Sequence, residues 1–178
     1  MFFISKFKKA VDELKVGDPE DKNTYIGVLA REDLAEALEK QVQDSVIQGA
    51  EIILGGNRKA AFFEPTIISK VSPGMPVFSE ETFGPVAAVI SFETEKQVID
   101  LVNNSQFGLG ASLFTEDMER VKRIVPQLNE GAVFVNSQVK SDPRLPFGGV
   151  KTSGFGRELS KHGIMEFVNK KTVYINKY

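Results

Sequence analysis

Apolar residues recur at helical spacing in two stretches of the first fifty residues, which predicts two amphipathic helices. The first stretch has its apolar positions at Phe3, Phe7, Val11 and Leu14. The glycine and proline of "GDP" mark its end, because glycine favours a helix stop and proline cannot continue a helix. The second helix is predicted between Glu32 and Gln48, and a short apolar strand, "EIIL", follows it.

A further extended segment, "FFEPTII", follows a glycine turn. Pro65 lies within it, and proline cannot donate to the hydrogen-bond ladder of a sheet. We therefore expect this segment to avoid the central position of a sheet.

The pattern becomes regular from residue 86 onward. Three apolar strands, "VAAVISF", "GASLF" and "AVFV", alternate with two helices. We expect Thr94 and Gln97 to cap the first helix and Thr115 to begin the second. The apolar face expected for the second helix comprises Met118, Val121, Ile124 and Val125. Strands that alternate with helices in this way predict an α/β fold with a parallel sheet that is covered on both faces.

The segment after Val135 is a loop of about twenty residues rich in Gly, Pro and Ser, a length that in a compact domain indicates function or disorder. A short helix from Arg157 to His162 and a final strand, "KTVYI", are predicted after it. The whole chain has the length of one domain.

The composition excludes several classes of partner and chemistry. The chain has 22 basic and 24 acidic residues, so it lacks the basic surplus that binding to nucleic acid requires. Its N-terminal apolar patch is too short to span a bilayer and precedes the lysines, so we expect a cytoplasmic protein without membrane contact. The absence of cysteine excludes disulfides, thiolate metal sites and a cysteine nucleophile within these residues.

The glycine-rich stretch "PFGGVKTSGFGRE" does not fit the common phosphate-binding loops. Val150 precedes Lys151 where a Walker loop needs glycine, and "GFGREL" lacks the third glycine of the dinucleotide fingerprint. On residue types alone, a surface turn without a ligand remains open. His162 is the only histidine and has no partner at metal-ligand spacing, so neither a metal site nor a Ser-His-Asp centre is expected.

Several segments taken together resemble a known family. "EETFGPV", "FGLGASLFTED", "GAVFVN" and "PFGGVKTSGFGRE" occur in the order and spacing of the C-terminal part of the aldehyde dehydrogenase superfamily. The tail that begins at "SDPRLPFGG" most resembles bacterial succinate-semialdehyde dehydrogenases. The resemblance implies that residues 1–170 form a portion of the catalytic domain and that residues 171–178 form an oligomerisation strand.

The resemblance also assigns roles to individual residues. Glu81 is implied to accept hydrogen bonds from the nicotinamide ribose of NAD or NADP, and Phe83 to lie against the nicotinamide. Phe147 is implied to form an aromatic wall of the aldehyde pocket, framed by the loop that begins at Asn136 and Ser137. Ser141 matches a serine that contacts the far carboxylate of the substrate, and Arg144 could add a cation there.

The chain departs from the family at one decisive point. The family's cysteine nucleophile, its glutamate base and its nucleotide-binding fold all lie upstream of the matching segments, and no catalytic residue is therefore assigned here. We expect the isolated chain to be inactive, to bind no cofactor, and to need the missing NAD-binding portion for any reaction with an aldehyde. Two explanations remain open. The chain is either part of a dehydrogenase or a non-catalytic remnant that acts through protein association, and self-association is expected in both cases.

Overall fold

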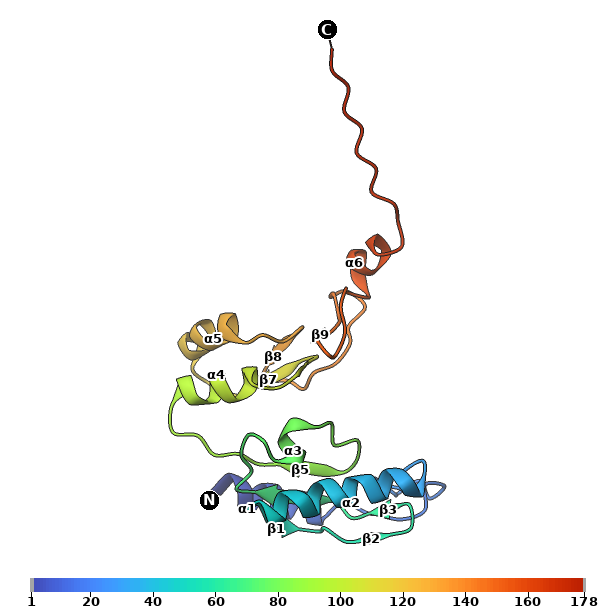
Figure 1. Ribbon diagram of the computed structural model, residues 1–178, viewed down its shortest axis with the longest axis vertical. Helices are drawn as coiled ribbons and strands as arrows, with labels where there is room; N and C mark the ends of the chain where they lie inside the picture. The colour runs from blue at the N-terminus through green and yellow to red at the C-terminus, as the bar shows by residue number, and fades with distance from the viewer. Residues whose placement is uncertain (1, 178) are drawn as a thin grey trace. The chain divides into compact units, whose positions relative to one another are not determined.

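The computed structural model describes residues 2–177 and divides the chain into two compact units, one up to Glu93 and one from Thr94 onward (Figure 1). The first unit contains α1 (Phe2–Asp12), α2 (Glu32–Ile47), β1 (Glu51–Leu54), β2 (Arg58–Lys59), β3 (Phe62–Phe63), β4 (Thr66–Ser69), α3 (Pro76–Ser79) and β5 (Val86–Ala88). The second contains α4 (Glu95–Asn103), β6 (Phe107–Gly108), β7 (Ala111–Leu113), α5 (Met118–Ile124), a 3-10 turn (Val125–Gln127), β8 (Val133–Val135), β9 (Val150–Lys151) and α6 (Ser160–Met165).

The sheet of the first unit has the order β1, β4, β5, with β4 antiparallel to β1 and parallel to β5. The expectation that Pro65 keeps this segment off a central position is therefore wrong, because β4 is the central strand. Pro65 directly precedes the strand, so its missing N–H falls outside the ladder that begins at Thr66. The backbone N–H of Thr66 donates to the carbonyl of Pro85 at 2.8 Å, so the first residue of the strand has a hydrogen-bond partner.

The core of the first unit lies between α2, the sheet and α3. Phe63 is completely buried, and it clusters with Leu38 and Val42 of α2 and with Ile68 of β4. Ser45 is buried beside them, where its hydroxyl donates to the carbonyl of Gln41 and accepts from the backbone N–H of Val77 at 3.2 Å. This hydroxyl stabilises the start of α3 against α2, because it satisfies an N–H that lacks a partner within the helix.

The first helix is confirmed, but its inward face differs from the predicted one. Phe7, Val11 and Leu14 are half-buried as expected, whereas Ile4 takes the place predicted for Phe3, which is exposed. A shift of one position is within the freedom of a short helix whose first turn has few neighbours.

The second unit contains a parallel pair, β7 and β8, connected by α5. The sequence predicted one parallel sheet from the segments that became β5, β7 and β8, and that part of the prediction is wrong. β5 pairs with β4, and β7 pairs with β8. Apolar runs identify strands, but they do not specify which strand is the neighbour. The α/β class itself is confirmed, since parallel strands alternate with helices in both units.

The helix caps agree with the sequence at one helix and not at the other. Thr94 caps α4, where its side chain accepts a hydrogen bond from the backbone N–H of Gln97 at 3.1 Å. For α5, Asp117 is the cap, while the hydroxyl of Thr115 accepts from the N–H of Asp117 in the preceding turn. Met118 was expected to face inward, but it is the first residue of α5 and its side chain is 56% exposed.

The C-terminal segment differs most from the prediction. α6 begins at Ser160 instead of Arg157, because Glu158 is still engaged in an extended bridge to Phe147. The strand "KTVYI" is not formed, since residues 169–177 adopt no helix or strand; Tyr178 lies outside the described residues. A strand needs a neighbour for its hydrogen bonds, and the described part of the chain offers none to this segment. Val173, Tyr174 and Ile175 are exposed.

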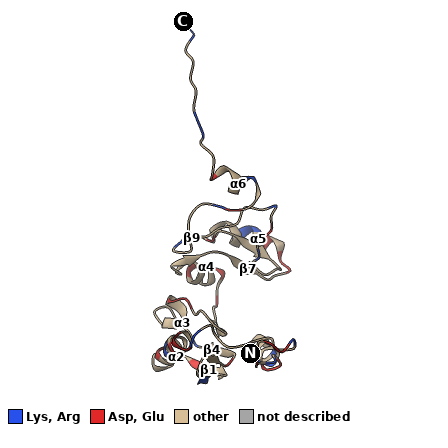
Figure 2. Cartoon of the chain, turned by 90° about the vertical axis from the view of Figure 1, so that its right-hand side faces the viewer, with Lys and Arg blue, Asp and Glu red and all other residues tan. Residues whose placement is uncertain are grey.

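Acidic and basic side chains are interspersed in both units (Figure 2). Among residues 2–177, no helix is both long and apolar enough to cross a membrane.

Candidate functional site: an acidic turn and a loop-lined cavity

The segment "EETFGPV" connects α3 to β5 in the first unit, and the side-chain amide of Gln41 contacts its start. The Nε2 atom of Gln41, on α2, donates to Glu80 Oε2 at 2.9 Å and to the carbonyl oxygen of Glu81 at 3.2 Å. The Glu80 carboxylate is thus engaged in the protein. The carboxylate of Glu81 accepts no hydrogen bond from any residue that the structure describes, and it is exposed.

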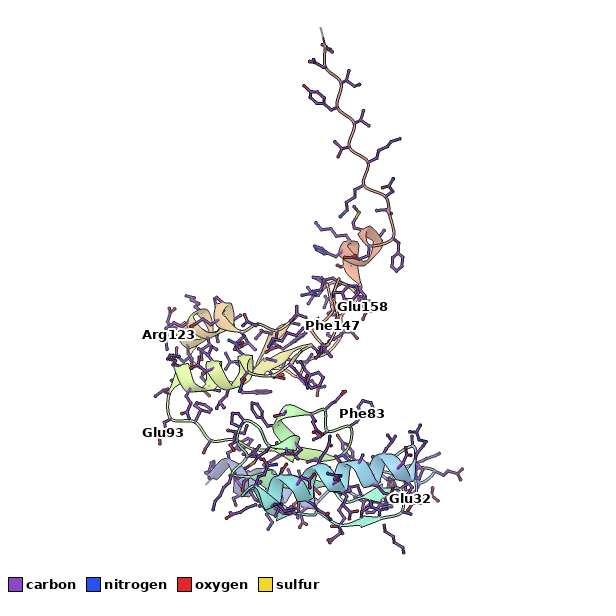
Figure 3. All side chains as sticks on the ribbon, viewed as in Figure 1. Glu32, Phe83, Glu93, Arg123, Phe147 and Glu158 are labelled. Atoms are coloured by element: carbon purple, nitrogen blue, oxygen red, sulfur yellow. The ribbon has the colours of Figure 1, made fainter. Side chains whose placement is uncertain are left out.

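Phe83 follows two residues later, and its side chain is 76% exposed (Figure 3). The adjacent Gly84 packs closely on α2, where an added Cβ would meet Leu38. The turn is therefore fixed by its backbone and by its glycine, while the carboxylate of Glu81 and the ring of Phe83 remain accessible. These are the two residues that the sequence predicts for the nicotinamide half of a cofactor, and that role stays a prediction.

The second candidate element is a cavity of about 390 Å³ in the second unit. Residues 131–135 around β8 form one side, and the loop contributes Lys140, Asp142, Leu145, Pro146 and Phe147. Its volume lies within the range of roughly 300–1,000 Å³ that is usual for small-molecule sites. The predicted wall residue Phe147 thus lies in a cavity of suitable size.

Phe147 is positioned by the glycine-rich loop. Its backbone N–H donates to the carbonyl of Glu158 at 3.0 Å, and its carbonyl accepts from the N–H of Glu158 at 2.8 Å (Figure 3). An added Cβ at Gly148 would lie 2.8 Å from the carbonyl oxygen of Gly156, and one at Gly131 would overlap with the carbonyl oxygen of Gly148. The glycines therefore permit close backbone contacts that fix this aromatic ring, as the sequence suggested.

The start of the loop is fixed in a similar way. Asn136 ends β8 with a positive φ of 52°. Its side-chain amide accepts from the backbone N–H of Thr115 and donates to the carbonyl of Thr115, both at 2.9 Å. The amide thereby extends the pairing of β7 and β8 by one step, and the cavity loop leaves the sheet from a defined point.

Ser141 and Arg144 do not line the cavity. Ser141 is exposed, and Arg144 forms a two-bond ion pair with Asp142, at 2.9 Å from Nε to Oδ1 and 2.6 Å from Nη2 to Oδ2. These bonds, with a further one from the backbone N–H of Arg144, hold the pKa of Asp142 far below its usual range, so the pair stays charged until the pH falls well below the normal range of an aspartate.

Sequence reasoning missed the two charged residues that do line the cavity, Lys140 and Asp142. The signal that could have found them is the alternation of charge in "KSDPR", which places one acid between two basic residues in the predicted functional loop.

Lys151 has a structural role in this loop. Its ammonium donates to the carbonyl of Asn103, the last residue of α4, at 3.2 Å and to the carbonyl of Ser105 at 2.9 Å. A cation at this end of a helix interacts favourably with unpaired carbonyls and with the helix dipole. The lysine is therefore engaged where a phosphate-binding lysine would have to be free.

Replacing Lys151 with methionine is expected to lower the free energy of unfolding by about 0.3–1 kcal/mol, because the two carbonyls lose their cation. Urea unfolding of the chain measures this difference. Lys161→Met is the matched control, since the ammonium of Lys161 forms no hydrogen bond or ion pair with residues 2–177. Equal stability of both variants would contradict the assigned role.

Other chemical groups are sparse in residues 2–177. No cluster of three or more His, Cys, Asp or Glu side chains is arranged to hold a metal ion. The Nδ1 atom of His162 lies 3.2 Å from Ser160 Oγ at the start of α6. Both residues belong to the same helical turn, and no acidic side chain contacts this histidine in the described part of the chain.

Comparisons with known proteins agree on one group of enzymes. The sequence profile described as the aldehyde dehydrogenase family matches residues 2–173. The curated succinate semialdehyde dehydrogenase [NAD(P)+] Sad of Escherichia coli (strain K12) is 43% identical over 175 residues, which are 97% of this chain and 38% of that protein. A succinate-semialdehyde dehydrogenase [NADP(+)] of Deinococcus radiodurans is 42% identical over 174 residues, which are 96% of this chain and 36% of that protein.

Solved structures give the same result. The succinic semialdehyde dehydrogenase of Streptococcus pyogenes, solved in complex with NADP+, has a TM-score of 0.91 at 34% identity and matches 99% of this chain. The succinate-semialdehyde dehydrogenase of Burkholderia pseudomallei has a TM-score of 0.89 at 39% identity and matches 93% of this chain. The matches cover 39% and 35% of those two chains, so the present sequence spans well under half the length of its relatives.

Proposed function

Because the chain belongs to the aldehyde dehydrogenase family, we propose that it supplies one part of an NAD(P)-dependent dehydrogenase that oxidises succinic semialdehyde to succinate. The observation that supports this most directly is the pair of accessible elements on the two units: an unengaged carboxylate beside an exposed ring, and a cavity walled by Phe147. The relatives named above are succinate-semialdehyde dehydrogenases, and they supply the proposed substrate.

The acidic turn fits the nicotinamide half of NAD or NADP. A free carboxylate such as that of Glu81 offers two acceptors to the adjacent hydroxyls of a ribose, and charge-assisted hydrogen bonds are stronger than neutral ones. Phe83 offers a flat apolar surface two residues away. When bound, the cofactor accepts a hydride from the substrate. The part of this chain would be to orient the ribose and to keep water from one face of the ring.

The cavity fits the aldehyde half of the reaction. Phe147 would exclude water from the reacting carbon, which protects a covalent acyl intermediate from premature hydrolysis. Ser141 is exposed in the same loop, and Arg144, three residues later, is paired with Asp142. Neither residue lines the cavity, so the loop would have to rearrange for either to contact the far carboxylate of the substrate. We retain Ser141 as a proposed substrate contact on the basis of the family resemblance, and an indirect role is proposed for Arg144 below.

The proposal extends to the organisation of the protein. Residues 1–170 would form a catalytic-domain portion, and residues 171–178 would pair with a neighbouring subunit of a homo-oligomer, in a cytoplasmic enzyme. The exposed apolar side chains of Val173, Tyr174 and Ile175 favour such a contact. The same observation supports the second candidate function, a non-catalytic protein that acts through association alone.

A chimera tests the proposed function. The chain is joined behind the N-terminal portion of the Escherichia coli relative, at the boundary of the matching region, and reduction of NAD+ and NADP+ is followed by absorbance. We expect oxidation of succinic semialdehyde in preference to butanal, which lacks the carboxylate, and a large loss with Glu81→Gln or Phe147→Ala. A folded chimera that oxidises no aldehyde would overturn the proposal.

A further inference from the structure

Three charged residues lie in sequence along the loop that closes the cavity, and two of them belong to its lining. Lys140 and Asp142 line the cavity, whereas Arg144 does not. The rest of the lining consists of glycine, alanine, valine, phenylalanine, leucine and proline. Any charge selectivity of this cavity therefore depends on one lysine and one aspartate.

The negative charge of Asp142 is compensated by the positive charge of Arg144, a residue outside the cavity lining. Both of its carboxylate oxygens accept hydrogen bonds from the guanidinium of Arg144, whose side chain is 85% exposed, whereas that of Asp142 is only 19% exposed. Two of the five guanidinium N–H groups of Arg144 are thus engaged by Asp142. In the described part of the chain, the ammonium of Lys140 forms no hydrogen bond and no ion pair within 4 Å. The three groups together carry one net positive charge, and Lys140 is the cation whose charge is not paired at close range.

We propose that Lys140 is the cation that selects a carboxylate-bearing ligand in this cavity, and that Arg144 acts indirectly by pairing with Asp142. The inference rests on the proposed function and deepens it, since it names the residue that would favour a small aliphatic carboxylate over an uncharged aldehyde. It also replaces direct contact by Arg144, which the sequence suggested, with a positioning role. The ammonium of Lys140 has three N–H donors and would bind the carboxylate of the ligand, while the carbon chain of the ligand would lie against Phe147, another residue of the lining.

The experiment is a titration of the complete 178-residue chain, labelled with ¹⁵N, with succinate at constant ionic strength. Saturable shifts are expected in the amide signals of residues 131–135 and 140–147. Succinamide has the same shape without charge and is expected to bind at least about tenfold more weakly, which corresponds to one charge-assisted hydrogen bond. Lys140→Met is expected to weaken succinate binding by a similar factor, and Lys140→Arg to restore most of it.

Two further variants separate the proposal from its alternatives. Lys122→Met, on α5 of the same unit, removes a lysine that pairs with Glu119 outside the cavity and is expected to leave binding unchanged. Arg144→Met is expected to weaken binding less than Lys140→Met. The reverse order, unchanged binding by Lys140→Met, or the absence of saturable shifts would each overturn the proposal. If the chimera is inactive but the titration gives the expected result, the proposed dehydrogenase function is refuted and the role of Lys140 in carboxylate binding stands. If the chimera is active but the titration fails, the role of Lys140 is refuted and the proposed function stands.

Discussion

The 178-residue polypeptide by itself is expected to produce no aldehyde-dependent reduction of NAD+ or NADP+. The mechanism that the family resemblance implies needs a thiolate that attacks the carbonyl carbon, and none of the 178 residues is a cysteine. Ser160 Oγ lies 3.2 Å from Nδ1 of His162, the only histidine, but no acidic side chain of residues 2–177 forms a hydrogen bond or ion pair with this histidine. The rate should therefore fall at least about a million-fold below that of a complete enzyme.

The measurement is a cofactor-reduction assay with purified chain and succinic semialdehyde, at enzyme concentrations high enough to detect a slow reaction. The matched control is the chimera described above, which has the same C-terminal residues and a cysteine upstream. Activity that remains with the chain through orthogonal purification steps, and that disappears in Phe147→Ala, would show that these residues contain a reactive centre of their own.

Phe63→Ala is expected to destabilise the first unit by about 3–5 kcal/mol, which is the usual loss for a large aromatic side chain removed from a core. Phe63 is completely buried among residues of α2, β4 and α3, so the vacated space is bounded by three elements that cannot all move inward. Because α2 also holds the acidic turn through Gln41, loss of this packing should loosen Glu81 as well. Denaturant unfolding followed by circular dichroism measures the stability.

Phe83→Ala is the control for this experiment. It deletes the same side chain from the same unit, but at a position that is 76% exposed, and stability should change by no more than about 0.5 kcal/mol. If both variants lost similar stability, the exposed ring of Phe83 would be part of the fold, and its availability to a ligand would be doubtful.

The fold was predictable where local chemistry decides it. The second helix, the strand after it and the Thr94 cap depend on periodicity and on hydrogen bonds within a few residues, and all three are present in the structure. The central position of β4 and the separation of β5 from β7 depend on which segments meet in space. Such pairings are set by tertiary packing, which a single sequence does not reveal.

The candidate site shows the same division. The roles of Glu81, Phe83 and Phe147 were predicted from specific motifs and stay predictions; in the structure Glu81 and Phe83 are exposed, and Phe147 belongs to the cavity lining. The pairing of Arg144 with Asp142 could not be read from the motif, since it depends on a turn that brings two residues of one loop into two-bond contact. The same turn leaves Lys140 as the available cation, a distinction that residue types alone do not make.

The contact between Gly131 and the carbonyl group of Gly148 limits how this loop could diverge among related proteins. A side chain at residue 131 would overlap with the backbone carbonyl of residue 148, and a side chain at residue 148 would lie too close to the carbonyl oxygen of Gly156, so a substitution at either position requires a shift of the backbone that it meets. Half of the sixteen intervening residues are exposed. Evolution could therefore alter the charge of the exposed loop positions more freely than Gly131 and Gly148, each of which is held by a close contact with other backbone.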